Sequence, residues 1–285
     1  NSKDMSQDLS LISTSGGVGS FVKQMAALRG NTTGTQSPKM LRLDGNTGEY
    51  VIKHWNNEAK QSEDKPFATP FLGTVILYKY FVQWKYKTTP EGIKIMSREF
   101  SSVKDEKLEL LKIDYNQQNK TEVMGVYDSY GAFKEAVKTV DPITKKEAFP
   151  FDFWVTLYVY VHELGEVVRF KFKGSTRSAW FDYNSGYRLD MADVEDICQV
   201  TTEFGTLKEE KPKSSTQEEA DSYYSGTFKT VRVNSEIEML EIMKSARYLA
   251  AWIASFNKES SHEEEIVIQK EEPQVHEIDV SQIPF

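Results

Sequence analysis

The chain has 285 residues, of which 39% are hydrophobic and 27% charged, enough to bury a substantial core in one large domain with tails. No apolar run approaches the roughly 18 residues that span a bilayer, and the single cysteine, Cys198, excludes an intramolecular disulfide. We therefore expect a soluble cytoplasmic protein with no membrane partner.

The net charge of −8 is concentrated in one segment. Residues 259–285 contain eight acidic residues and one lysine, a net charge of −7, so the remainder of the chain is nearly neutral. The segment has too few apolar residues to form a core, which predicts a disordered acidic tail.

We interpret residues 1–66 as a partly flexible N-terminal extension. Phe21, Met25 and Leu28 recur at helical spacing, which predicts a short helix over 18–29. Polar segments follow, and residues 56–66 are expected to form an exposed loop, so that the core begins at Phe67.

Residues 71–88 alternate with a period of two, which predicts a long strand with an aromatic face and a face rich in lysine. A turn at 89–92 leads into a partner strand over 93–101, and 107–114 is consistent with either a third strand or a short helix. The spacing from Tyr130 to Val137 predicts a helix.

Residues 153–161 alternate again, and a turn leads into 167–173, where three basic side chains share one face. Two further strands are expected at 197–208 and 223–233, around a polar hairpin tip at 209–221. A capping-box pattern opens an amphipathic helix over 235–258. Its expected buried stripe is Ile237, Leu240, Met243, Ala246, Leu249, Ile253 and Phe256.

These elements predict a mainly β protein with flanking helices, in the α+β class. About five curved strands, with a helix between the third and fourth, favour an OB-like barrel over residues 67–234. The same spacing also permits another small barrel or a sandwich.

The last residues, from Glu277 to Phe285, are acidic and finish with Ile283-Pro284-Phe285. This segment resembles the C-terminal tip of bacterial single-stranded-DNA-binding proteins, which is acidic and finishes with Ile-Pro-Phe. The resemblance covers the tail alone. It implies a bacterial or phage protein that coats single-stranded DNA in replication, repair or recombination and docks other proteins through Asp279, Ile283, Pro284 and Phe285. The alternative is a solvated acidic tail whose apolar end is accidental.

Aromatic and basic residues interleave along the central strands, and single-stranded DNA is held by base stacking on aromatic rings with cations along the phosphates. For Trp154, Tyr158 and Tyr160, contact with bases and coverage of a second core are both open. Residues 174–187 could form either a loop that grips a nucleotide or a helix that plugs the barrel. The candidate DNA-binding residues are Lys79, Phe81, Trp84, Lys85, Lys87, Lys94, Arg98, Trp154, Tyr158, Tyr160, Arg169, Lys171 and Lys173.

Enzymatic motifs are incomplete. His162-Glu163 lacks the second histidine of a zinc protease, and four histidines with one cysteine do not suggest a clustered zinc site. We expect no catalytic activity, no cofactor and no metal, and a homo-oligomer is left open. The rival interpretation is a β-rich protein-interaction or phage structural protein whose acidic tail only solubilises it and which does not bind DNA.

Overall fold

The computed structural model describes residues 37–56, 61–86, 89–117, 119–140, 147–187, 194–210 and 222–262. For residues 54–56, 61–62 and 254–262 it describes the backbone alone. The predicted helix at 18–29, Lys87, most of the predicted hairpin tip and nearly all of the acidic tail lie outside the described residues.

The described part of the chain is mainly β and combines strands with α-helices, which confirms the α+β class. The helices are α3 (Tyr130–Val137), α4 (Gly174–Gly186) and α5 (Glu236–His262), with short 3-10 turns η1 (Tyr115–Gln117) and η2 (Ile197–Gln199). The strands are β1 (Lys39–Leu43), β2 (Tyr50–Asn56), β3 (Gln61–Phe67), β4 (Phe71–Trp84), β5 (Ile93–Ser97), β6 (Leu108–Asp114), β7 (Lys120–Tyr127), β8 (Thr139–Val140), β9 (Glu147–Ala148), β10 (Phe151–Val161), β11 (Glu166–Phe172), β12 (Val200–Glu210) and β13 (Ser222–Val233).

The described part of the chain divides into two compact units. Among the described residues, unit 1 comprises those within 37–77, 157–170 and 174–262, and unit 2 comprises those within 78–156 and 171–173. Strands β4, β10 and β11 therefore contribute residues to both units.

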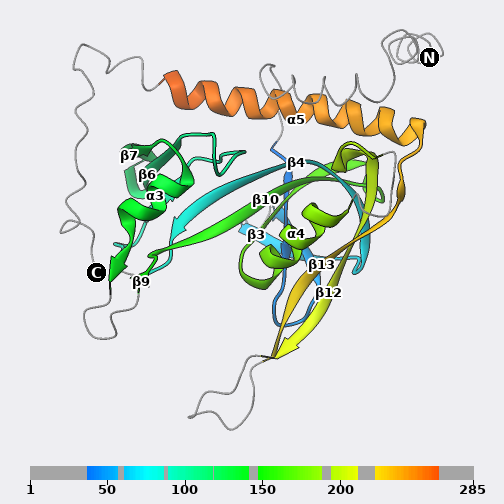
Figure 1. The fold of residues 1–285 in the computed structure, drawn as a ribbon. Helices are drawn as coiled ribbons and strands as arrows, with labels where there is room; N and C mark the ends of the chain where they lie inside the picture. The colour runs from blue at the N-terminus through cyan, green and yellow to red at the C-terminus, as the bar shows by residue number, and fades with distance from the viewer. Residues whose placement is uncertain are drawn as a thin grey trace. The chain divides into compact units, whose positions relative to one another are not determined.

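In unit 1 the strand order is β3-β2-β1-β11-β10-β4, and β12 pairs with both β4 and β13. Strand β1 runs parallel to β11, whereas β2 and β3 pair antiparallel. Strands β12 and β13 form the long hairpin coloured yellow to orange in Figure 1. Aromatic rings fill the core between these strands, with Tyr50 5.0 Å from Phe71 and Phe71 stacked on Phe204 at 4.6 Å.

Helix α5 covers one face of the unit 1 sheet. It begins at a capping box in which the Ser235 backbone amide donates to Glu238 at 2.8 Å and the Glu238 amide donates back to Ser235 at 3.3 Å. Ile242, Ala246 and Leu249 are buried in its contact with the sheet. The predicted helix is confirmed, but Ile237 is not part of its buried stripe because 72% of it is exposed.

In unit 2 the strands follow the order β11-β10-β4-β5-β6-β7, and helix α3 comes after β7 (Figure 1). Strands β4, β5, β6 and β7 form an antiparallel meander. One side of this sheet is an aromatic core, in which Phe133 of α3 lies 5.0 Å from Phe151 and Tyr80 lies 5.4 Å from Phe153.

The structure corrects two boundary predictions. Residues 61–67 form strand β3 instead of an exposed loop, and β1 and β2 contribute buried residues such as Leu41 and Tyr50, so the core begins well before Phe67. The structure also decides two alternatives that the sequence left open. The segment at 107–114 forms strand β6, and the segment at 174–187 forms helix α4, whose Trp180 is fully buried.

The paired strands form an open sheet, so the OB-like barrel stays a prediction. None of the helices in the described ranges is both long enough and apolar enough to cross a bilayer.

Candidate nucleic-acid interface

Two aromatic rings from neighbouring strands of unit 2 form a stack. The rings of Phe81 on β4 and Trp154 on β10 lie 5.7 Å apart between centroids, with 12° between their planes. Phe81 is only 3% exposed, whereas Trp154 is partly exposed. Trp154 is therefore the more exposed ring of the stack, and Phe81 is the buried one.

Lys171 of β11 and Lys173, which directly follows the strand, lie over these rings. The Lys171 ammonium is 4.5 Å from the centroid of Phe81, and the Lys173 ammonium is 5.1 Å from the centroid of Trp154. Both distances fall within the range at which a cation is attracted to the negative face of an aromatic ring. Strand alternation explains the arrangement, because residues 171 and 173 are two positions apart and project to the same side of β11.

A carboxylate partners each of these lysines. Lys171 Nζ is 3.1 Å from Oε1 of Glu99, and the buried Thr156 hydroxyl donates to the same oxygen at 3.0 Å. Lys173 forms an ion pair with Asp152, which precedes Trp154 by two residues on β10. Glu99, Asp152 and Thr156 were not among the predicted site residues, although the spacing of Asp152 from Trp154 would have placed it on the same face.

Strand register places three more predicted cations on this side of the sheet. Lys79, Phe81 and Gln83 alternate along β4 and therefore share one face. Gln83 pairs with Met96 of β5, so Lys94 and Arg98, each two positions from Met96, project to that face as well. We call this surface the Trp154 face, comprising Lys79, Phe81, Lys94, Arg98, Trp154, Lys171 and Lys173.

The cations of the Trp154 face differ in their surroundings. Arg98 Nε is 2.6 Å from Oε2 of Glu109, so this arginine is also paired with a carboxylate. Lys79 and Lys94 form no ion pair with any described residue, and burial lowers the pKa of Lys94. A DNA phosphate near Lys94 would therefore stabilise its charged form.

Three of the predicted DNA contacts, Trp84, Tyr158 and Tyr160, are buried in this structure. Trp84 lies on the opposite side of the sheet and packs edge-on against Phe151 at 5.2 Å. Tyr158 and Tyr160 are 2% and 5% exposed, in the core that α5 covers. The sequence left two alternatives open for these tyrosines, contact with bases or coverage of a second core. Their packing under α5 matches the second.

Arg169 belongs to the same covered region of unit 1. Its guanidinium lies 5.7 Å from the ring of Trp252 on α5, and its Nε is buried without a hydrogen-bond partner. Lys85, in contrast, is exposed after the end of β4 with its ammonium 5.0 Å from the ring of the exposed Tyr86. Lys85 is thus available to a ligand, whereas the guanidinium of Arg169 packs on the ring of Trp252.

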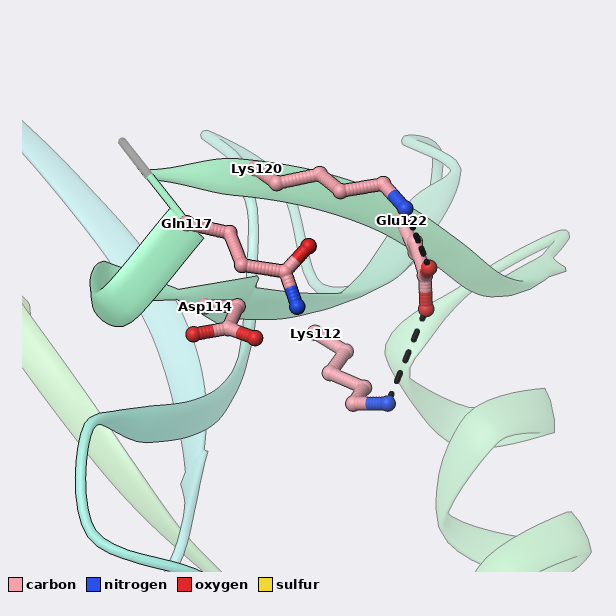
Figure 2. A pocket seen from close by; sticks show the side chains of 5 residues that line it. All are labelled: Lys112, Asp114, Gln117, Lys120 and Glu122. Atoms are coloured by element: carbon pink, nitrogen blue, oxygen red, sulfur yellow. Dashed lines mark ion pairs between the residues drawn. The ribbon is translucent and has the colours of Figure 1, made fainter.

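A pocket between β6 and β7 in unit 2 has a different character. It is lined by Lys112, Asp114, Gln117, Lys120 and Glu122. Figure 2 shows Glu122 between the two lysines. Its Oε2 is 3.7 Å from Nζ of Lys112, and its Oε1 is 3.5 Å from Nζ of Lys120. Two lysines and two carboxylates leave no excess charge, so the pocket does not offer a site for an anion.

The described residues contain no group of three or more histidine, cysteine or acidic side chains that could hold a metal. Searches against protein-family models, curated proteins and solved structures found no match to this chain.

Proposed function

We propose that this protein binds single-stranded DNA with little sequence preference through the Trp154 face of unit 2. The observation that carries the proposal is a partly exposed tryptophan, backed by Phe81, with Lys171 and Lys173 beside the two rings. A base stacked on an aromatic ring contributes roughly 1–3 kcal/mol whatever its identity, and lysines nearby contact the phosphates.

The acidic segment supports the same class of function. Residues 259–285 carry the Ile283-Pro284-Phe285 motif that resembles the tip of bacterial single-stranded-DNA-binding proteins. We propose that this segment docks replication or repair proteins while the folded part coats the DNA, and that the protein acts without catalysing a reaction.

The order of strands in unit 2 favours an OB-like arrangement as part of this proposal. Strands β4, β5 and β6 form a meander, α3 follows, and β10 returns to pair with β4. OB-folds are partly open Greek-key barrels of this general kind, and they bind oligonucleotides on one face.

One observation favours the rival function, a β-rich protein-interaction module without DNA affinity. Lys171, Lys173 and Arg98 are each paired with a carboxylate, so part of the charge on the Trp154 face is already neutralised. Those pairs are partly exposed to solvent, however, and such pairs contribute little stability, so phosphates can compete for the cations.

A double substitution tests the proposal. Lys171→Ala with Lys173→Ala should weaken binding to a fluorescent oligo-dT and reduce the salt slope of the affinity by at most about 1.4, since each phosphate contact on a single strand contributes about 0.7 when no internal carboxylate is freed. Lys112→Ala with Lys120→Ala removes the same charge from the same unit and serves as the matched control. Equal effects of the two double variants would indicate a bulk charge effect and contradict a site at Trp154.

A further inference from the structure

We propose that Asp152 and Glu99 are internal competitors of the DNA phosphates, which hold Lys173 and Lys171 on the aromatic stack until single-stranded DNA displaces them. This inference rests on the proposed function and adds a regulatory element to the same site. It assigns a role to the two carboxylates that pair with these lysines.

The Lys173 pair controls access to the outer ring. The ammonium is ion-paired with Asp152 and at the same time lies 5.1 Å from the centroid of Trp154. Asp152 and Trp154 project from the same side of β10, so the carboxylate keeps the lysine beside the indole. A base that stacks on this ring needs the space that the lysine side chain fills.

The Lys171 pair is held more firmly. Glu99 Oε1 accepts from both Lys171, at 3.1 Å, and the fully buried Thr156 hydroxyl, at 3.0 Å. Thr156 thereby fixes the position of the carboxylate, and the carboxylate fixes Lys171 over the ring of Phe81. The side chains of Lys171 and Glu99 are both 22% exposed, so a phosphate can still reach this pair.

On DNA binding, each lysine therefore exchanges its carboxylate partner for a phosphate, and the number of its ion pairs does not increase. When Lys173 leaves Asp152 for a phosphate, the base takes the place of the ammonium on Trp154, and the carboxylate becomes an unpaired negative charge beside the DNA. The freed carboxylate opposes binding by repulsion and recovers a counterion from solution. Both effects weaken the affinity and flatten its dependence on salt.

Neutral substitutions separate this account from a purely structural role. Asp152→Asn and Glu99→Gln retain the shape of the side chain and remove its charge, so each should tighten binding to oligo-dT about two- to fivefold, the range expected for a solvent-accessible ion pair. Each should also make the affinity fall more steeply with salt. Glu122→Gln is the matched control, because Glu122 also pairs with lysines of unit 2 but lies in the pocket between β6 and β7.

The experiment is a fluorescence-anisotropy titration of oligo-dT with the full-length wild type and the three variants at two salt concentrations, with a thermal melt of each to establish folding. Tighter binding by the Asp152 and Glu99 variants alone is the expected result. If the wild type binds and all three variants bind with its affinity, the competitor role is wrong and the proposed function stands. Equal tightening by Glu122→Gln would also overturn the inference, since it would indicate overall charge. If neither the wild type nor any variant binds, the proposed function fails, and this inference fails with it.

Discussion

Trp154 lies on Phe81 with 12° between the ring planes and 5.7 Å between the centroids, and the two rings differ in their access to solvent. Phe81 is buried, whereas Trp154 is partly exposed. The stack therefore has one inner and one outer ring. Under the proposed function, a base stacks on the outer ring once Lys173 moves, so we expect the aromatic contribution to DNA binding to depend chiefly on Trp154.

Replacing Trp154 with alanine should weaken oligo-dT binding about tenfold, because it removes the ring on which a base stacks. Trp154→Phe keeps an aromatic face and should retain most of the affinity. The measurement is a titration of labelled oligo-dT with each variant. Wild-type affinity in Trp154→Ala would show that this ring does not contact DNA.

Replacing Tyr158 with alanine should act on stability instead. Tyr158 is 2% exposed and packs in the core under α5, so truncating the ring leaves a cavity and should cost about 3–5 kcal/mol of unfolding free energy. Tyr248→Ala is the control, because Tyr248 lies on α5 itself but is 77% exposed. Its effect should stay within about 0.5 kcal/mol in urea unfolding. A similar loss in both variants would contradict the burial of Tyr158.

Glu238 should make the stability of unit 1 sensitive to acid. The hydrogen bonds from Arg232, at 2.5 and 2.7 Å, lower the pKa of Glu238 from 4.5 to about 2. Since the folded carboxyl binds its proton less readily than the unfolded one, its stabilising contribution is present above pH 4.5 and is lost as the pH falls toward 2.

Glu238→Gln should therefore lower the Tm at pH 7, and the difference from wild type should narrow as the pH falls below about 4.5. Glu236→Gln, in the same first turn of α5, is the control for loss of charge near the start of the helix. A difference that stays constant from pH 7 to about pH 3 would argue against the Arg232 pair as its cause.

The acidic segment should have two separable effects. Phe285→Ala should abolish the binding of replication or repair proteins and leave DNA affinity unchanged, because it removes no charge. Deleting residues 259–285 removes a net charge of −7 and should tighten DNA binding, most visibly at low salt. Pull-downs and oligo-dT titrations distinguish the two. Recovery of the same partners by Phe285→Ala would contradict docking through this motif.

The elements with strong periodicity could be predicted from the sequence. Strands β4, β10 and β11 and the helices α3 and α5 all lie where alternation or helical spacing placed them. Strand β3 was missed because its sequence, QSEDKPF, is polar and contains a proline, and its pairing with β2 is a tertiary effect that no local pattern reports.

The composition of the candidate site could be predicted only in part. Alternation groups Phe81 with Lys79 on one face of β4, but it could not show that Phe81 stacks on Trp154 or that α5 covers the far end of β10. Tyr158 and Trp154 project from the same face of β10. Tyr158 is nevertheless covered by α5, which begins 78 residues later in the sequence at Glu236, whereas Trp154 is partly exposed. Which part of a strand is covered depends on long-range packing.

The central claim is tested most directly by comparing the binding of the full-length protein to fluorescent oligo-dT and to a duplex of equal length, at low and moderate salt. The account predicts tighter binding to oligo-dT at both salt concentrations and an affinity that falls as salt rises, because bases stack on Trp154 and phosphates contact the lysines around it. Absent binding, or equal binding to the two substrates, would contradict it.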